Sequence, residues 1–307
     1  MMKKLLALLT VLALVFSFAA CAGNSGNDAT AAPEESAEAQ TADAAPIETP
    51  ENPTIRLSTT TSVNDSGLLP YLLPAFESKT GYKVEVASAG TGKAIEHAKS
   101  GEADLLLVHS KKQEEAFIDE GYASTERLSF MYNYFIIVGP TDDPAAISDL
   151  ETAADCFKAI ADKEAGFASR GDDSGPHNKE KGIWEAAGID PAGNDWYASL
   201  GDGMGNTLTK ANEMNAYCLT DKATYLSMKD SLPNLTILKA EAEDMKNTYS
   251  LLGVNPEAKD FAGKDVKLNT EGANALIEWL LSDEAAALIA EYGKDQYGEQ
   301  LFYLIEK

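Results

Sequence analysis

The loop from Ser169 to His177 contains the residue types that bind an anion. Arg170 stands just before Gly171, Ser174 and Gly175, and the segment ends where we predict a helix to begin. An arginine supplies a fixed positive charge, and the first backbone N–H groups of a helix have no partners within the helix. The loop therefore predicts a site for an oxyanion.

A second polar loop, Thr59 to Ser62, follows a short alternating stretch and lies far from the first loop in the sequence. A tetrahedral dianion without a proton offers acceptors only, so its site should present donors and no inward carboxylate. Arg170 can hold two oxygens with its planar fork. We expect the ligand to contact hydroxyl groups, glycine amides and this guanidinium: Thr60, Thr61, Ser62, Thr91, Gly92, Arg170, Ser174 and Gly175.

Two carboxylates, Asp172 and Asp173, stand beside the predicted anion site. We expect one of them to cap the helix that follows and the other to hold Arg170 from behind, with both facing away from the ligand. The alternative is that both are solvated surface acids.

Each of these segments also has a plainer interpretation. Thr59 to Ser62 could be only a polar loop, Thr91 part of a turn between glycines, and Arg170 the partner in a surface ion pair. Gly171 to Pro176 resembles the nucleophile loop of serine proteases, but the second aspartate breaks the spacing and no histidine stands in a suitable context. We therefore predict no enzymatic activity and no cofactor.

The N-terminus predicts export rather than folded structure. Residues 1–20 combine two lysines with an apolar run, which is typical of a signal peptide. Small residues before Cys21 indicate a lipoprotein cleavage site, with the lipid on Cys21; Phe18 departs from this pattern, and ordinary secretion is the alternative. Residues 21–53 are rich in Ala, Glu, Thr and Pro and predict a disordered tether. We expect an extracytoplasmic protein anchored to the cell membrane by its lipid.

Composition excludes several classes of function. The formal net charge of −24 makes nucleic acid an improbable partner. The three histidines show no metal-ligand spacing, so we predict no protein-bound metal cation. Cys156 and Cys218 do not make a disulfide framework; we expect two buried thiols, with a single disulfide as the alternative.

From Thr54 onward, strand and helix patterns alternate in an α/β order. Apolar runs near residues 130–138 and 249–254 predict two crossings between a first lobe (54–138 and 250–307) and a second lobe (139–249). We therefore predict two doubly wound lobes with a central cleft and two hinge crossings, and ligands in such folds bind at strand ends. Near the site, the predicted elements are strands 55–58 and 82–87 and helices 93–100, 147–162 and 178–187.

Eight short motifs are spread over both lobes of the chain: Ser58–Ser62, Ser66–Leu69, Gly90–Ala94, Ala103–His109, Met131–Asn133, Ser169–Glu180, Gly203–Leu208 and Leu219–Asp221. In these motifs the chain resembles the tungstate-binding proteins of ABC importers. Pro176 departs from the family pattern, which usually has threonine there, and it removes one backbone donor.

The resemblance implies an extracytoplasmic solute-binding protein of the type II periplasmic-binding-protein-like class. Such a protein would capture tungstate and deliver it to an ABC permease in the membrane, and we expect it to be monomeric. Molybdate, sulfate and phosphate receptors are the alternatives within this class. A membrane-tethered sensor or adhesion lipoprotein is the alternative from another class.

Overall fold

The structure, a computed structural model, describes residues 49–306. The predicted signal peptide (1–20), the predicted lipid attachment at Cys21 and the predicted tether up to residue 48 lie outside this range. Within it, no helix has both the length and the apolar character needed to cross a membrane.

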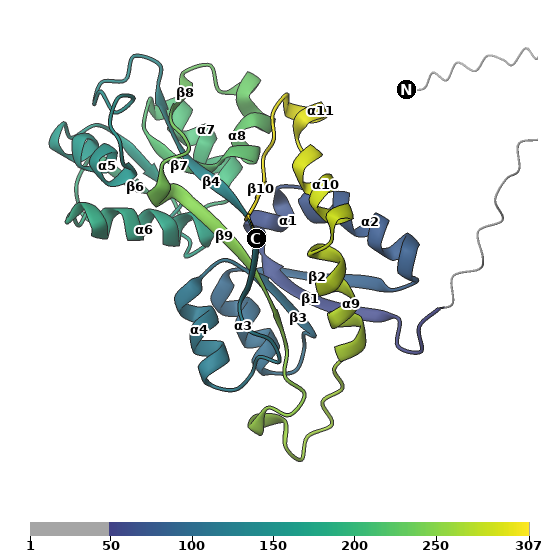
Figure 1. The fold of residues 1–307 in the computed structure, drawn as a ribbon. Helices are drawn as coiled ribbons and strands as arrows, with labels where there is room; N and C mark the ends of the chain where they lie inside the picture. Colours follow the sequence, from purple (N-terminus) through teal and green to yellow (C-terminus); the bar gives the residue numbers. More distant parts are fainter. Residues whose placement is uncertain (1–48, 307) are drawn as a thin grey trace, which may run out of the picture. The chain divides into compact units, whose positions relative to one another are not determined.

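Three parallel strands and the helices between them begin the fold (Figure 1). Strand β1 (Thr54–Thr60) pairs with β2 (Lys83–Ala89) on one side and with β3 (Leu105–Val108) on the other. Side chains of β3 alternate between two hydrophobic clusters, one formed with α2 (Leu68–Thr80) and the other with α3 (Thr91–Lys99) and α4 (Lys111–Asp119). Helices therefore cover both faces of this sheet, as its apolar strands require.

Two long antiparallel strands connect this part of the chain to the rest. Strand β4 (Leu128–Pro140) pairs with β9 (Lys246–Gly253) up to Tyr134, and from Phe135 onward it pairs with β7 (Cys218–Asp221) and β8 (Leu235–Lys239). Strand β9 also pairs with β3. One continuous sheet thus passes through both groups of elements.

The second group of elements packs around the far half of β4. It contains helices α5 (Ala153–Asp162), α6 (Gly175–Ala187), α7 (Met204–Met214) and α8 (Lys222–Met228), and the two-stranded sheet of β5 (Phe167–Ser169) and β6 (Tyr197–Ser199). Alternate residues of β4 again face two clusters, one with α5 and α6 and one with α7 and α8. We call this group the second lobe, and the elements around β1–β3 the first lobe; the predicted boundaries at 138/139 and 249/250 stay a prediction.

The C-terminal segment packs back on the first lobe, as the sequence pattern predicts. Helices α9 (Thr270–Leu280) and α10 (Asp283–Glu291) cover one face of its sheet. The short elements complete the chain: α1 (Thr61–Asp65), α11 (Lys294–Tyr297), the two-residue strand β10 (Tyr303–Leu304), which pairs with β4, and 3-10 turns at Lys229–Ser231, Glu243–Met245 and Lys259–Phe261.

Several helices begin at other residues than the sequence pattern predicts. Helix α5 begins at Ala153 rather than 147, because Thr152 caps it by accepting a hydrogen bond from the N–H of Asp155. Helices α3 and α6 begin two and three residues earlier than predicted, at Thr91 and Gly175. Cys156 and Cys218 are free, buried thiols, which confirms the expected thiols rather than a disulfide.

We predict that Asp104 is the polar residue on which the first lobe depends most. Its buried carboxylate accepts hydrogen bonds from Arg56 N (2.7 Å), Arg56 Nε (3.1 Å) and Asn269 N (2.9 Å). Asp104→Ala would leave these donors unpaired and lower the free energy of unfolding by about 3 kcal/mol in urea titrations. Asp265→Ala, which removes an exposed carboxylate, should leave stability unchanged; equal effects of the two substitutions would contradict this role.

Candidate functional site

Three helices begin at the strand ends that face the gap between the lobes. Helix α1 follows β1, α3 follows β2, and α6 follows β5 through the loop of Arg170. The N-cap residues of these helices, Thr60, Gly90 and Ser174, make no side-chain capping hydrogen bond. Their first-turn amides, including those of Gly92 and Gly175, therefore have no side-chain cap, and such groups suit an anion. Pro176 lies in the first turn of α6, where a missing donor is tolerated.

The two predicted loops come together in the folded chain. A Cβ atom on Gly175 would lie 3.2 Å from His109 Cε1 and 4.0 Å from Ser62 Oγ. A Cβ atom on Gly90 would lie 3.8 Å from the carbonyl oxygen of Asp173. The beginning of α6 in the second lobe therefore packs directly against the strand ends of the first lobe, and a larger side chain at 175 would push His109 away.

The hydroxyl group of Ser62 lies at the centre of a polar cluster. Its Oγ is 3.1 Å from Thr60 Oγ1, 3.2 Å from His109 Nε2 and 3.2 Å from Tyr249 OH. Burial lowers the pKa of His109 to about 4, so its ring is neutral at pH 7. Burial also raises the pKa of Tyr249, so the phenol stays protonated and can donate a hydrogen bond to Ser62.

Arg170 is held by Asp172. Arg170 Nε donates to Asp172 Oδ2 over 2.8 Å, and the N–H of Ser174 donates to Asp172 Oδ1 over 3.1 Å. Burial alone would raise the pKa of Asp172, but the adjacent Ser174 and the charge of Arg170 outweigh burial and lower it. Asp172 thus holds Arg170, whereas α6 has no side-chain cap, so the capping role that we expect of one aspartate stays a prediction.

Asp173 and Ser174 differ sharply in their surroundings. The Asp173 side chain is 81% exposed and pairs with Lys181 Nζ at 2.7 Å, so its role behind Arg170 stays a prediction. The Ser174 hydroxyl is buried and has no hydrogen-bond partner among the described residues. A buried, unpaired donor of this kind is typical of a site that awaits a ligand.

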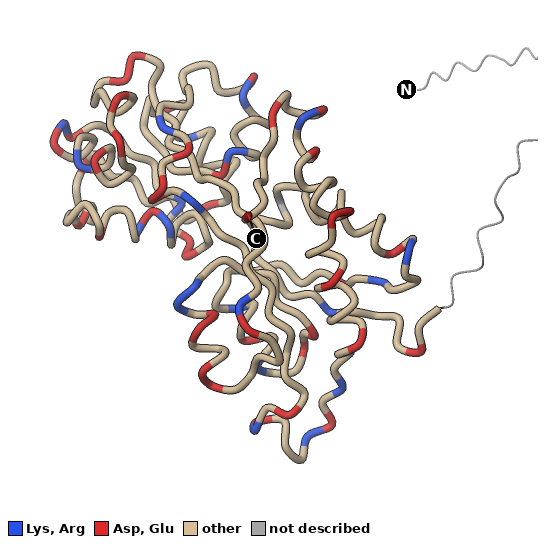
Figure 2. Tube along the Cα trace, in the orientation of Figure 1, with Lys and Arg blue, Asp and Glu red and all other residues tan. Residues whose placement is uncertain are grey.

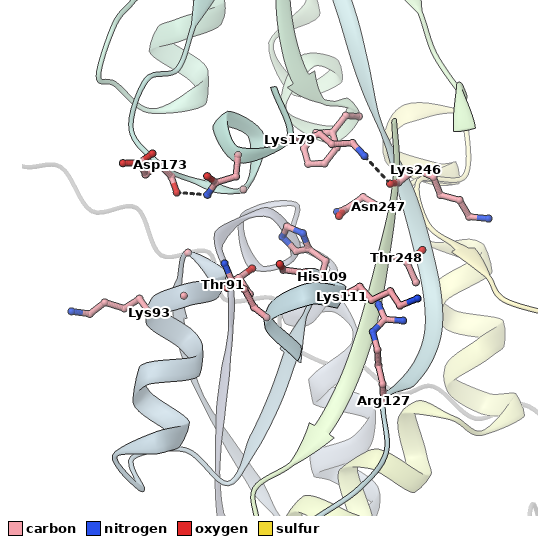
Figure 3. A pocket seen from close by; sticks show the side chains of 17 residues that line it. Thr91, Lys93, His109, Lys111, Arg127, Asp173, Lys179, Lys246, Asn247 and Thr248 are labelled. Atoms are coloured by element: carbon pink, nitrogen blue, oxygen red, sulfur yellow. Dashed lines mark hydrogen bonds between the residues drawn. The ribbon is translucent and has the colours of Figure 1, made fainter. Parts of the chain in front are cut away.

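The predicted ligand residues are distributed over two neighbouring cavities. A cavity of about 340 Å³ is lined by Thr61, Ser62, Arg170 and the unpredicted Asp221. A larger cavity of about 700 Å³ is lined by Thr91, Gly92 and Gly175 (Figure 3). Thr60 and Ser174 are buried and line neither cavity. Ser62 lines the smaller cavity, whereas His109 and Gly175 line the larger one, so their contact lies between the two cavities.

Sequence reasoning missed Asp221, a carboxylate that lines the smaller cavity. Its carboxylate caps α8, accepting from Thr224 N (2.9 Å) and Thr224 Oγ1 (2.8 Å). Burial raises the pKa of Asp221, although Thr224 and the charge of Arg170 oppose that rise. The expectation of a cavity without carboxylates was therefore wrong for this wall, although both oxygens of Asp221 already accept bonds from Thr224. The sequence signal that could have revealed Asp221 is a helix-capping residue at the end of a predicted strand.

The larger cavity also contains cations that the prediction did not include. Its basic lining residues are Lys93, Lys111, Arg127, Lys179 and Lys246, and its acidic lining residue is Asp173. Figure 3 shows Lys179 and Asn247 on one side of the cavity and His109, Lys111 and Arg127 on the other. These residues come from separate elements, so their spacing in the sequence does not predict that they line one cavity.

Comparison with known proteins agrees with this architecture. The family model described as a PBP superfamily domain matches residues 39–284. The tungstate-binding protein TupA of Peptoclostridium acidaminophilum is 44% identical over 305 residues, which covers 98% of each chain. TupA of Campylobacter jejuni subsp. jejuni is 33% identical over 237 residues, covering 75% of this chain and 84% of that protein.

Two solved structures are also similar. The tungstate-binding protein TupA from Desulfovibrio alaskensis G20 has a TM-score of 0.73 at 34% identity, covering 83% of this chain and 100% of that chain. The tungstate ABC transporter protein from Geobacter sulfurreducens has a TM-score of 0.66 at 42% identity, covering 78% and 98%.

Fold and matched domain together define a member of the PBP, or periplasmic-binding-protein, superfamily, so the predicted fold class is confirmed. Within this superfamily, the chain belongs to the family of tungstate-binding proteins.

We predict that His109 makes stability depend on pH. Its pKa is about 4 in the folded protein against an ordinary 6.5, so the unfolded chain binds more protons between these values. This contribution is complete above pH 6.5 and is lost as the pH falls towards 4. Glu180, whose pKa burial raises to about 7, has the opposite effect, stabilising the fold as the pH falls from 7 to 4.5.

The two contributions separate in a comparison of variants. In urea titrations, the free energy of unfolding of His109→Gln should fall less than that of wild type as the pH drops from 6.5 to 4. Glu180→Gln should lack the increase in this free energy that Glu180 contributes as the pH drops from 7 to 4.5. Parallel pH profiles for wild type and His109→Gln would contradict the predicted role of His109.

Proposed function

We propose that this protein captures tungstate in the cleft between its lobes and delivers it to an ABC permease in the membrane. The observation that carries this proposal is the contact of Ser62 and His109 with Gly175, which brings uncapped helix beginnings from both lobes together. The printed names of the relatives supply the ligand: they are tungstate-binding proteins and a tungstate ABC transporter protein.

The chemistry of the cleft supports a fully ionised tetrahedral anion. Hydroxyl groups of Thr60, Thr61, Ser62, Thr91 and Ser174, amides of Gly92 and Gly175, and the Arg170 guanidinium offer donors to its oxygens. Asp221 already accepts hydrogen bonds from Thr224 with both carboxylate oxygens, so its place in the fold is explained without a ligand. Asp172 keeps Arg170 in place and does not need to contact the ligand.

The remaining parts of the proposal concern location and assembly. The protein acts outside the cytoplasm as a binding component rather than an enzyme, and a lipid on Cys21 holds it at the membrane through the tether of residues 21–53. It works as a monomer. The lobes close on the ligand by bending at β4 and β9, near the boundaries 138/139 and 249/250.

Substitution of Arg170 tests the function directly. Arg170→Ala would remove the charged donor from a bound dianion, and we expect tungstate affinity to fall by at least about 2–3 kcal/mol, or roughly 30- to 150-fold, in titration calorimetry. Arg170→Lys keeps the charge but loses the planar fork, so it should lie between wild type and Arg170→Ala. Unchanged affinity in Arg170→Ala would move the site elsewhere.

Tyr249 offers a second test, because its hydroxyl contacts Ser62 on the side away from the solvent. Tyr249→Phe keeps the ring and should weaken tungstate binding about tenfold by disordering the Ser62 hydroxyl. In a double-mutant cycle, Tyr249→Phe should cause little further loss of tungstate affinity in a protein that already carries Ser62→Ala.

The matched control for this cycle is Tyr225→Phe. Tyr225 is also buried, and its hydroxyl contacts the carbonyl oxygen of Leu235 rather than Ser62. Its loss should leave affinity unchanged. Fully additive effects of Ser62→Ala and Tyr249→Phe would contradict the proposed coupling.

A further inference from the structure

The charge around Arg170 is already balanced before any ligand binds. Its guanidinium pairs with Asp172, and Asp221 lines the same cavity, where burial raises the pKa of Asp221 and the charge of Arg170 partly opposes that rise. One cation therefore faces two carboxylates. A bound dianion would add two further negative charges, and a second positive group nearby would stabilise the complex by balancing them.

Lys179 lines the larger, neighbouring cavity and lacks a carboxylate partner. Its Nζ donates to the backbone carbonyl oxygen of Lys246 over 3.2 Å, and no described carboxylate lies within ion-pairing distance of it. Burial lowers the pKa of Lys179, against the weaker opposing effect of Asp244 and Glu243. A partly buried ammonium without a counterion costs stability, which indicates that it serves a ligand.

The other basic residues of the larger cavity are compensated or directed elsewhere. Arg127 pairs with the buried Glu114, and Lys111 lies 3.6 Å from Glu115. The ammonium of Lys246 packs over the ring of Tyr132, 4.2 Å from its centroid. Lys93 extends away from the cavity (Figure 3).

The position of Lys179 relates it to the predicted ligand contacts. It follows Gly175 by four residues on α6, so the two lie on the same face of the helix, and both line the larger cavity with Thr91 and Gly92. Its charge also acts on His109, which contacts Ser62. Lys179 is therefore close to the point where the two lobes meet.

We propose that Lys179 is a ligand-binding residue whose ammonium group balances the second negative charge of the tetrahedral oxyanion. Arg170 and Lys179 then act from the two ends of the same loop-and-helix segment, and the anion replaces the counterion that Lys179 lacks. This inference rests on the proposed function and names the group that completes its charge balance.

Titration calorimetry of the processed protein with tungstate at low ionic strength tests this inference. Lys179→Gln should weaken binding about 10- to 100-fold, since removing a charged hydrogen-bond donor from a bound anion lowers affinity by about that factor. Lys179→Arg, which keeps the charge, should recover most of the affinity. The matched control is Lys181→Gln, which replaces an exposed lysine two residues along the same helix that pairs with Asp173. The tungstate affinity of this variant should change less than twofold.

Urea unfolding without any oxyanion separates a ligand role from a structural one. If Lys179 serves the ligand, Lys179→Gln should unfold at the same urea concentration as wild type or at a higher one, because an uncompensated cation is lost. A lower midpoint that Lys179→Arg restores would assign Lys179 to holding α6 against β9 and would overturn the inference.

The outcomes also distinguish this inference from the proposed function. If wild-type protein binds no tungstate, the proposed function fails and the inference fails with it. If wild type binds tungstate and Lys179→Gln matches Lys181→Gln, the function stands and the role of Lys179 is refuted.

Discussion

The antiparallel pairing of β4 with β9 is the interaction on which the rest of the structure depends. The ladder ends at Tyr134 and Lys246, and the next residues of β4 pair with strands of the second lobe. Its last rungs include Asn133 and Asn247, which share a buried hydrogen bond of 3.1 Å, and β9 also carries Tyr249 towards Ser62. The same two strands thus connect the lobes and supply part of the lining of the larger cavity.

Local charge, rather than the charge of the whole protein, decides what this cleft can hold. Acidic residues are spread over both lobes (Figure 2), and the formal net charge is −24. That field slows the approach of an anion modestly. Uncapped helix amides, buried hydroxyls and cations at 170 and 179 act over a few ångströms, where solvent screens them far less. A strongly acidic protein can therefore bind an anion, provided that its nearby carboxylates are occupied.

Local sequence patterns predicted the parts of the site that depend on short segments. The loop of Arg170, a bond from Arg170 to one of the two neighbouring aspartates and the alternation of strands and helices all involve neighbours in sequence. Contacts such as His109 and Tyr249 with Ser62 join distant segments through the sheet, and no spacing rule reveals them. The two-residue strand β10 was missed for the same reason, because only its pairing with β4 defines it.

The central claim is that the cleft is built for a fully ionised tetrahedral dianion, and tungstate is the ligand that the family suggests. Titration calorimetry of the processed wild-type protein with tungstate, molybdate, sulfate and phosphate at neutral pH tests it most directly. The account predicts tight, one-to-one binding of tungstate and poor binding of phosphate, which carries a proton at this pH. Absence of heat and of thermal stabilisation with tungstate, or tighter binding of phosphate, would contradict it.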